Sequence, residues 1–273
     1  SENGDGYYDD SRPDCTVFQG TIETGDQSTY YAVRVTDGSN QRAYFDGKFV
    51  GAIYVSTGDS YNSGVVINGF QTCTSSPSSL GAVVIQSGYN VFNHKISATE
   101  DIFYVNGGHS IFNGQANITS DSTGHLFTVL DGTFIYNGIF GDISKRGESN
   151  TISGGTLIIN SYLEHYGSSY PSMVDVFDLS GGTLEINDKV KHFQNTVGSG
   201  IVNMTGGYLK LNGAQLISDT PDNAGHCIRL DNKTFSGSIF NNSWTNIPTV
   251  FQSGSFHNEL TGGGTLFYSD KLY

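Results

Sequence analysis

Short runs in which apolar and polar residues alternate follow one another along most of the chain, with turn-forming residues between them. Clear examples are DIFYV at 101–105, TLIIN at 156–160 and DKVKHF at 188–193. Alternation with a period of two is typical of a strand that buries one face. No stretch with a helical period separates these runs, so the pattern predicts an all-β protein.

One phrase recurs within this pattern: a glycine, an alternating run, and an Asn five residues after the glycine. It reads SGGTLIIN at 153–160 and SGGTLEIN at 180–187. The six clear glycines are spaced by 20, 24, 23, 27 and 25 residues, and with their Asn partners they are Gly88 and Asn93, Gly108 and Asn113, Gly132 and Asn137, Gly155 and Asn160, Gly182 and Asn187, and Gly207 and Asn212. A loose but persistent period of this length indicates stacked repeats, in which each unit buries its apolar side against its neighbours.

Each period holds three alternating runs, which predicts one coil of a parallel β-helix for each repeat. Glycine suits a sharp bend with positive φ, and Asn is the other residue that best tolerates such a corner. Stacked Asn amides can hydrogen-bond from coil to coil. A leucine-rich horseshoe has a similar period, but its Leu-x-x-Leu-x-Leu frame is absent. We therefore expect a single-stranded solenoid of about eight to ten coils of about 20–27 residues.

The phrase fades toward both ends, which predicts three segments. Residues 1–35 are expected to be an N-terminal tail or cap, 36–235 the parallel β-helix, and 236–273 the terminal coils with a C-terminal cap, because the open ends of a solenoid need covering. Weaker copies of the phrase are assigned to Gly69, to the region of Lys233 and to Gly254.

Composition and charge narrow the functional classes. The net charge of −13 opposes binding to nucleic acid or an anionic membrane. The chain contains no run of 18 apolar residues, so the sequence predicts no membrane-spanning helix. The three cysteines, Cys15, Cys73 and Cys227, have no metal-binding spacing. We therefore expect neither a metal nor another cofactor.

The repeat alignment places Asp101, His125, Glu148 and Asp175 at equivalent positions, seven residues before the glycine. Carboxylates stacked on neighbouring strands with an imidazole perturb one another's pKa values, which can separate the roles of acid and base in glycoside hydrolysis. The alternative interpretation is a polar turn that precedes each strand. Glu148 and Asp175 are therefore candidate catalytic residues.

Asp178 lies close to Asp175 in the sequence and follows the longest coil, which carries several aromatic residues. A long loop with tyrosines on a rigid scaffold suits the stacking of sugar rings. Asp178 is the third catalytic candidate, and the candidate substrate-binding residues are Tyr162, His165, Tyr166 and Tyr170. The alternative is that the tyrosines only cover the flank of the solenoid.

A further column, three residues after the glycine, reads Val91, Ile111, Ile135, Ile158, Glu185 and Lys210. If it faces outward, it forms an apolar stripe that needs a partner, followed by a Glu–Lys pair. If it faces inward, its apolar members belong to the core.

The repeated GG-T-L-x-I-N coils, over about residues 66–235, resemble the right-handed parallel β-helix of the pectin-lyase-like group. With the acidic charge and the abundance of Asn, Gly, Ser and Thr, the chain also resembles bacteriophage tailspike and tail-fibre proteins. That resemblance implies a right-handed helix, a homotrimer, a location on the virion surface and a host cell-surface polysaccharide that is bound and often cleaved.

Two functional hypotheses follow. The first is a virion spike or fibre that binds, with or without cleavage, a surface polysaccharide of a host cell. The second is a secreted or cell-surface bacterial protein that acts as a polysaccharide lyase, hydrolase or adhesin. The chain lacks a calcium-binding run of aspartates with a nearby catalytic Arg, so enzymatic activity stays open in both.

Overall fold

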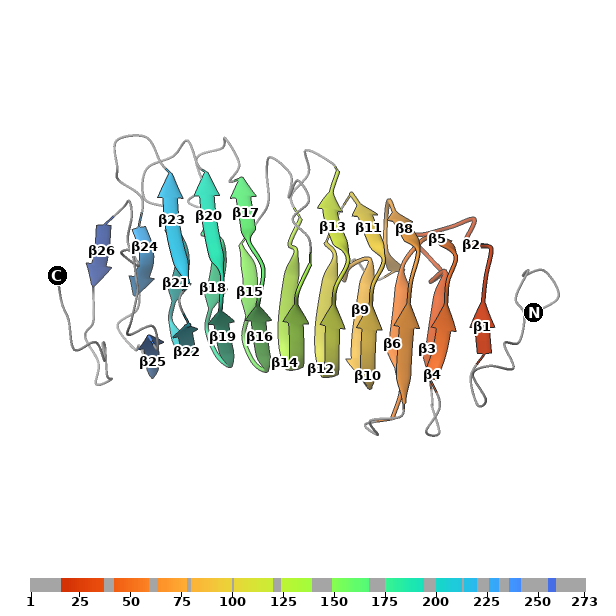
Figure 1. Ribbon diagram of the computed structural model, residues 1–273, viewed down its shortest axis with the longest axis horizontal. Coiled ribbons are helices and arrows are strands. Elements are labelled where there is room, and N and C mark those ends of the chain that lie inside the picture. The colour runs from red at the N-terminus through yellow and green to blue at the C-terminus, as the bar shows by residue number, and fades with distance from the viewer. Residues whose placement is uncertain are drawn as a thin grey trace.

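The computed structural model shows an all-β solenoid of parallel strands, which confirms the predicted fold class. Its coils stack along the long axis of the molecule (Figure 1). The described residues are 16–36, 42–58, 63–77, 80–99, 101–119, 124–138, 149–166, 175–193, 200–212, 214–219, 226–230, 236–241 and 255–258.

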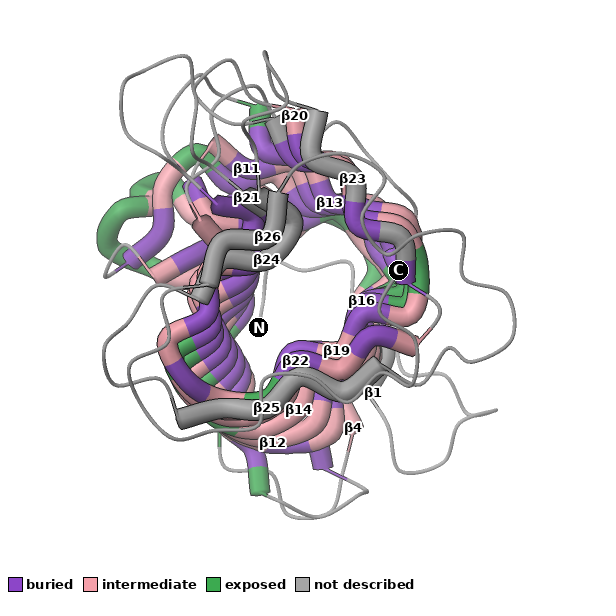
Figure 2. Tube along the Cα trace, turned by 90° about the vertical axis from the view of Figure 1, so that its left-hand side faces the viewer, coloured by how far each residue is buried: buried purple, intermediate pink, exposed green. Residues whose placement is uncertain are grey.

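The described strands lie on three faces, which surround a common axis in the end-on view (Figure 2). Face 1 contains the strands that precede the glycine bend. They pair in the order β3 (Val33–Thr36), β6 (Ile53–Ser56), β9 (Val83–Ser87), β12 (Phe103–Phe112), β14 (Phe127–Tyr136), β15 (Asn150–Ile152), β18 (Phe177–Leu179), β21 (Gly200–Met204), β24 (His226–Leu230) and β26 (Ser255–Asn258).

Face 2 contains the strands that follow the bend, and the long strands β12 and β14 continue through the bend into it. The order is β1 (Thr16–Phe18), β4 (Arg42–Phe45), β7 (Gly64–Ile67), β10 (Tyr89–Phe92), β12, β14, β16 (Thr156–Ile159), β19 (Thr183–Ile186), β22 (Gly206–Leu211) and β25 (Ser236–Asn241). Strands β1, β2 and β3 pair with the next coil, so residues 16–36 already belong to the stack.

In the part of the chain that the structure describes, the strands of face 3 form two sheets. The first contains β2 (Thr21–Glu23), β5 (Lys48–Val50), β8 (Phe70–Cys73), β11 (Lys95–Ala98) and β13 (Gln115–Ile118). The second contains β17 (Leu163–Tyr166), β20 (Lys189–Phe193) and β23 (Gln215–Asp219).

The repeated glycines form one column at the bend between faces 1 and 2, as the repeat predicted. All six have positive φ, between 60° and 93°. A Cβ on Gly182 would lie 2.5 Å from the backbone carbon of Gly154 and 2.5 Å from the carbonyl oxygen of Gly155 in the preceding coil. Both the left-handed conformation and the close approach of the coils therefore require glycine here.

The repeated Asn residues form a continuous ladder at the corner between faces 2 and 3. Each amide nitrogen donates to the side-chain oxygen of the preceding coil, over 2.6–2.9 Å, through Asn212, Asn187, Asn160, Asn137, Asn113, Asn93, Asn68 and Asp46. Asp46 ends the ladder with a carboxylate, which only accepts hydrogen bonds when ionised. The repeat predicted the six Asn residues from Asn93 to Asn212 and missed the two earlier members.

The structure corrects the assignment of Gly69 to the glycine bend. Phe70 pairs with Lys95, so Gly69 lies in register with His94, one residue beyond the Asn ladder. A Cβ on Gly69 would lie 2.1 Å from the carbonyl oxygen of Gly47, so this corner has a second glycine column of its own. Gly69 directly follows the ladder residue Asn68, whereas each glycine of the bend precedes its Asn by five residues.

Inward-facing apolar side chains fill the interior. Aromatic rings stack from coil to coil: the ring centroids of Phe103 and Phe127 are 5.9 Å apart, and those of Phe112 and Tyr136 are 5.4 Å apart. Burial raises the pKa of the Tyr136 hydroxyl far above its usual range. The single core of stacked rings explains why consecutive coils stabilise one another.

His94 is fully buried in this interior among Phe49, Phe92 and Phe112. Its Nε2 atom lies 2.9 Å from Oε1 of Gln71, which can only accept, so Nε2 carries the proton. The Nδ1 atom is buried and has no hydrogen-bond partner. Burial accordingly lowers the pKa of His94 from 6.5 to about 3, because the charged imidazolium would lose its hydration.

Candidate functional site

The described candidates lie along face 3 and at the start of face 1. Tyr162 directly precedes β17, at the corner that carries the Asn ladder, whereas Asp175 and Asp178 lie beyond the corner between faces 3 and 1, just before and within β18. The connection there spans residues 167–176, the longest of the segments that join face 3 to face 1 within the chain from β2 to β24. Glu148 and Tyr170 lie outside the described residues. The geometry of the site is therefore defined by Asp175, Asp178 and the strands β17 and β20.

The alignment of Asp101, His125 and Asp175 agrees with the strand register. In successive coils the paired residues are Tyr104, Thr128, Thr151 and Asp178, which lie three residues after the aligned positions. The first two members connect their coils directly. The backbone N–H of His125 donates to Oδ1 of Asp101 over 2.7 Å. The imidazole Nδ1 of His125 lies 2.6 Å from the carbonyl oxygen of Ser149, so it donates to the next coil. These contacts are those of a polar turn that links coils.

Asp175 and Asp178 occupy different environments. Asp175 is 1% exposed, whereas Asp178 faces outward from face 1 and is half-buried. One carboxylate oxygen of Asp178 accepts a hydrogen bond from Nδ2 of Asn203 in the next coil, over 2.9 Å. Asp178 is thus the described carboxylate of the catalytic set that a ligand on the outer surface could reach directly.

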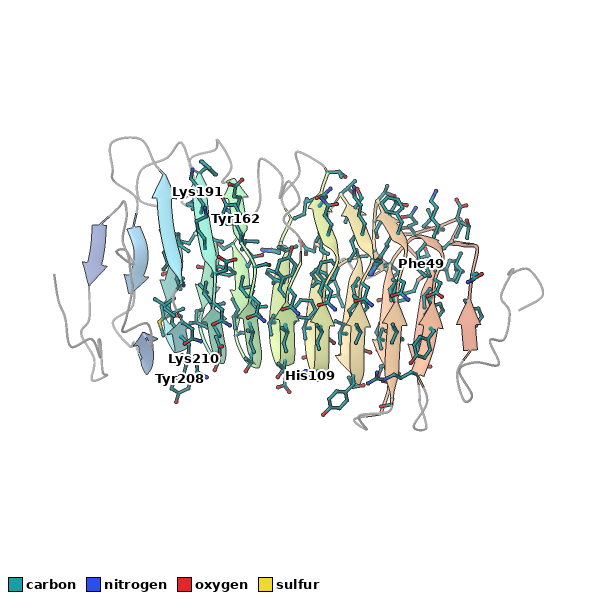
Figure 3. All side chains as sticks on the ribbon, viewed as in Figure 1. Phe49, His109, Tyr162, Lys191, Tyr208 and Lys210 are labelled. Atoms are coloured by element: carbon teal, nitrogen blue, oxygen red, sulfur yellow. The ribbon has the colours of Figure 1, made fainter. Side chains whose placement is uncertain are left out.

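Tyr162 lies at the edge of face 3 beside charged side chains of the same and the next coil. The ammonium nitrogen of Lys189 lies 4.2 Å from the centroid of its ring. Its hydroxyl hydrogen-bonds to Oε1 of Glu164, and Glu164 pairs in register with Lys191. Figure 3 shows Tyr162 and Lys191 on neighbouring coils of this face.

The second ring on this face is Phe193, and the Lys191 ammonium nitrogen lies 4.0 Å from its centroid. We call Tyr162, Glu164, Lys189, Lys191 and Phe193 the face 3 patch. It combines two aromatic rings with two positively charged hydrogen-bond donors, Lys189 and Lys191, and a negatively charged acceptor, Glu164. The candidates predicted from the sequence do not include Lys189, Lys191 or Phe193, although their alternation in KVKHF indicates a common outward face.

His165 lies on the inner side of the same strand. It is 2% exposed and stacks on the fully buried His192, with ring centroids 5.1 Å apart and Nδ1 atoms 3.1 Å apart. One of these two nitrogens must donate to the other, so the pair holds complementary tautomers. The structure therefore separates His165 from the outward face of Tyr162 and Glu164. The backbone of Tyr166 pairs with Phe193, while its side chain lies outside the described part.

The apolar column of face 2 points outward. Val91, Ile111, Ile135 and Ile158 pair in register and are half-buried, whereas the residues on either side in these strands, such as Asn90 and Phe92, are buried. This settles the question that the sequence left open, against the inward orientation. The stripe ends at Glu185, whose Oε2 atom lies 3.9 Å from Nζ of Lys210 in the next coil.

Among the described residues, no group of three or more His, Cys, Asp or Glu side chains could hold a metal ion. Within the same part of the chain, no helix is long and apolar enough to cross a membrane.

Comparison with known proteins found no family model, no curated protein and no solved structure that matches the chain. What the structure itself defines is the class of parallel β-solenoids.

Proposed function

We propose that the protein is a rigid extracellular or virion-surface rod that binds a polysaccharide of a host cell, as tailspike and tail-fibre proteins do. The observation that carries the proposal is the face 3 patch on β17 and β20, of which β17 leads into the long connection 167–176. Sugar rings stack on aromatic side chains, and their hydroxyl groups need donors and acceptors at the rim. Tyr162, Glu164 and the two lysines supply such groups on a scaffold that the Asn ladder holds in register.

Binding is better supported than cleavage. Of the candidate carboxylates, Asp178 is on the outer surface, Asp175 is buried, and Glu148 lies outside the described residues. Cleavage would use two of the three as general acid and base, with Asp178 the one that reaches the ligand directly. Replacing Glu148 and Asp175 together by their amides tests this: glycan release should stop while binding persists, and unchanged release refutes the assignment.

The binding site can be tested on a glycan array and on host cells with the variant Tyr162→Ala. We expect about tenfold weaker binding, because the stacking surface is lost. Tyr30→Ala is the matched control, since Tyr30 is 63% exposed and belongs to the connection between β2 and β3. Equal binding by both variants would place the receptor site elsewhere on the solenoid.

We further propose that the rod is a homotrimer in which the outward stripe Val91, Ile111, Ile135 and Ile158 is buried between subunits. Burying a continuous apolar stripe between subunits removes it from water and so lowers the free energy of the assembly. Sedimentation should give three times the chain mass of 29.4 kDa, and Ile135→Asp should give a folded monomer. A monomeric wild type would instead favour the alternative, a secreted or cell-surface bacterial lyase, hydrolase or adhesin.

A further inference from the structure

Four Asn–Gly steps lie within the described residues: Asn68–Gly69, Asn106–Gly107, Asn113–Gly114 and Asn137–Gly138. In such a step the backbone nitrogen of the glycine can attack the side-chain amide carbon of the Asn, because glycine has no Cβ to obstruct the approach. The reaction requires the amide to leave its hydrogen bonds and rotate toward the backbone. The four steps therefore share the same local sequence chemistry but not the same freedom to react.

Three of these Asn residues belong to the ladder, where both atoms of the amide are held. Nδ2 of Asn113 donates to Asn93 over 2.9 Å, and Oδ1 of Asn113 accepts from Asn137 over 2.9 Å. Asn137 in turn accepts from Asn160 over 2.8 Å. Asn68 donates to Asp46 over 2.6 Å and accepts from Asn93 over 2.9 Å. Rotation of any of these amides breaks two hydrogen bonds.

Asn106 is placed differently. It is exposed at the bend between faces 1 and 2, where the pairing of β12 with β14 shifts register on both sides of it. Its side chain makes one hydrogen bond, from Nδ2 to Oε1 of Gln86 over 2.9 Å. Rotation of this amide costs one exposed hydrogen bond, and the local strand pairing is already irregular.

We infer that Asn106 is a site of spontaneous deamidation and that the ladder protects the other three Asn–Gly steps. The Gly107 nitrogen forms a bond to Cγ of Asn106, and the bond from Cγ to Nδ2 breaks. The Gly107 nitrogen loses its proton and Nδ2 leaves as ammonia, which gives a cyclic succinimide. Water then opens the ring at either carbonyl, which produces aspartate or isoaspartate at position 106.

The modification has a structural consequence, because Asn106 pairs in register with Asp131 of the next coil. A carboxylate at position 106 lies opposite the carboxylate of Asp131 and no longer donates to Gln86. Like charges on directly opposed residues of neighbouring strands repel each other. Deamidation therefore weakens the bend between these two coils.

Peptide mapping by mass spectrometry tests the site, after the folded protein is incubated at mildly alkaline pH. Asn106 should gain about one mass unit, the difference between an amide and an acid, at least about fivefold faster than Asn68, Asn113 or Asn137, because one fewer hydrogen bond must break. In urea all four steps should react at similar rates, which shows that the fold causes the difference. Equal rates in the folded protein, or slower reaction at Asn106, would overturn the inference.

Two variants sharpen the test. Gln86→Ala removes the remaining hydrogen bond and should accelerate the reaction at Asn106 about fivefold, while the ladder sites stay unchanged. Asn106→Asp mimics the product, and its thermal midpoint should fall below that of the wild type. Asp131→Asn in the same chain should restore part of this loss. If the addition of Asp131→Asn does not raise the thermal midpoint, the repulsion between positions 106 and 131 is refuted.

Discussion

The two corners that flank face 3 differ in how much the length of the connecting segment varies from coil to coil. The connections from face 2 to face 3 are two or three residues long, from 19–20 in the first coil to 160–162 and 187–188 in later ones. The connections from face 3 to face 1 range from 51–52 to 167–176. The first corner carries the Asn ladder with Tyr162 beside it, and the second borders the carboxylate candidates Asp175 and Asp178. A solenoid can vary one corner freely because the stacking at the others sets the register.

Stability and binding depend on different side chains of these corners. At the Asn corner, side chains of adjacent coils bond to each other, so a change affects the contacts on both sides. Asp178, beyond the variable corner, and Tyr162, on the outer side of the Asn corner, instead belong to the candidate site. Substitutions in the ladder should therefore cost stability, whereas substitutions of these two side chains should mainly affect binding.

The largest expected effect concerns His94, which directly follows the ladder residue Asn93. Between pH 6.5 and about 3 the unfolded chain binds a proton at His94 and the native chain does not. Stability is therefore lost as the pH falls through this window, by about 1.4 kcal/mol per unit and about 4–5 kcal/mol in total.

Urea unfolding at a series of pH values measures this slope, with His94→Gln as the variant. The substitution removes the titrating group, so stability between pH 4 and 6 should depend less on pH than in the wild type, by about one proton. Identical slopes would mean that the buried imidazole does not limit acid stability.

The next largest effect concerns the glycine bend. Gly182→Ala places a Cβ 2.5 Å from backbone atoms of the preceding coil and forces alanine to a φ of 65°. We expect a loss of about 3 kcal/mol or more, from the left-handed conformation and the clash. Gly25→Ala is the control, because a Cβ there meets no atom within 4 Å. Similar unfolding midpoints for the two variants would show that the coils can separate at little cost.

A smaller effect is expected in the ladder. Asn137→Ala removes the hydrogen bonds of Asn137 to Asn113 and Asn160, which should cost about 1–2 kcal/mol because the bonds are exposed. Asn137→Asp should cost more, since a carboxylate cannot donate to Asn113. Denaturant unfolding measures both variants. If Asn137→Asp were more stable than Asn137→Ala, the direction of donation assigned to the ladder would be wrong.

The smallest effect on stability is expected at the outward side chains of the candidate site. Asp178→Asn and Tyr162→Ala should change the free energy of unfolding by about 0.5 kcal/mol or less, because both side chains are outside the core. Tyr162→Ala should still weaken glycan binding. A loss of stability as large as that of Gly182→Ala would show that these side chains are structural and would remove the basis of the comparison.

The sequence alone determined the solenoid, because each coil repeats the same local requirements. Gly at 155, 182 and 207 with an Asn five residues later marks two corners, and the alternation between them marks the strands. A pattern that would be weak evidence in one coil predicts the fold because it recurs in successive coils. The same alignment placed Asp101, His125 and Asp175 in one column, which the strand register reproduces.

Only the tertiary structure decided what lies next to what across coils and which side of each strand faces water. It turned Ile135 and Ile158 outward, buried His165 against His192, and brought Lys189 over the ring of Tyr162. A one-residue shift of register exchanges the two faces of a strand, and the sequence of a single coil does not contain the register. The register is set by the packing of neighbouring coils. The sequence therefore indicated which segments hold the candidate site but not which side chains meet there.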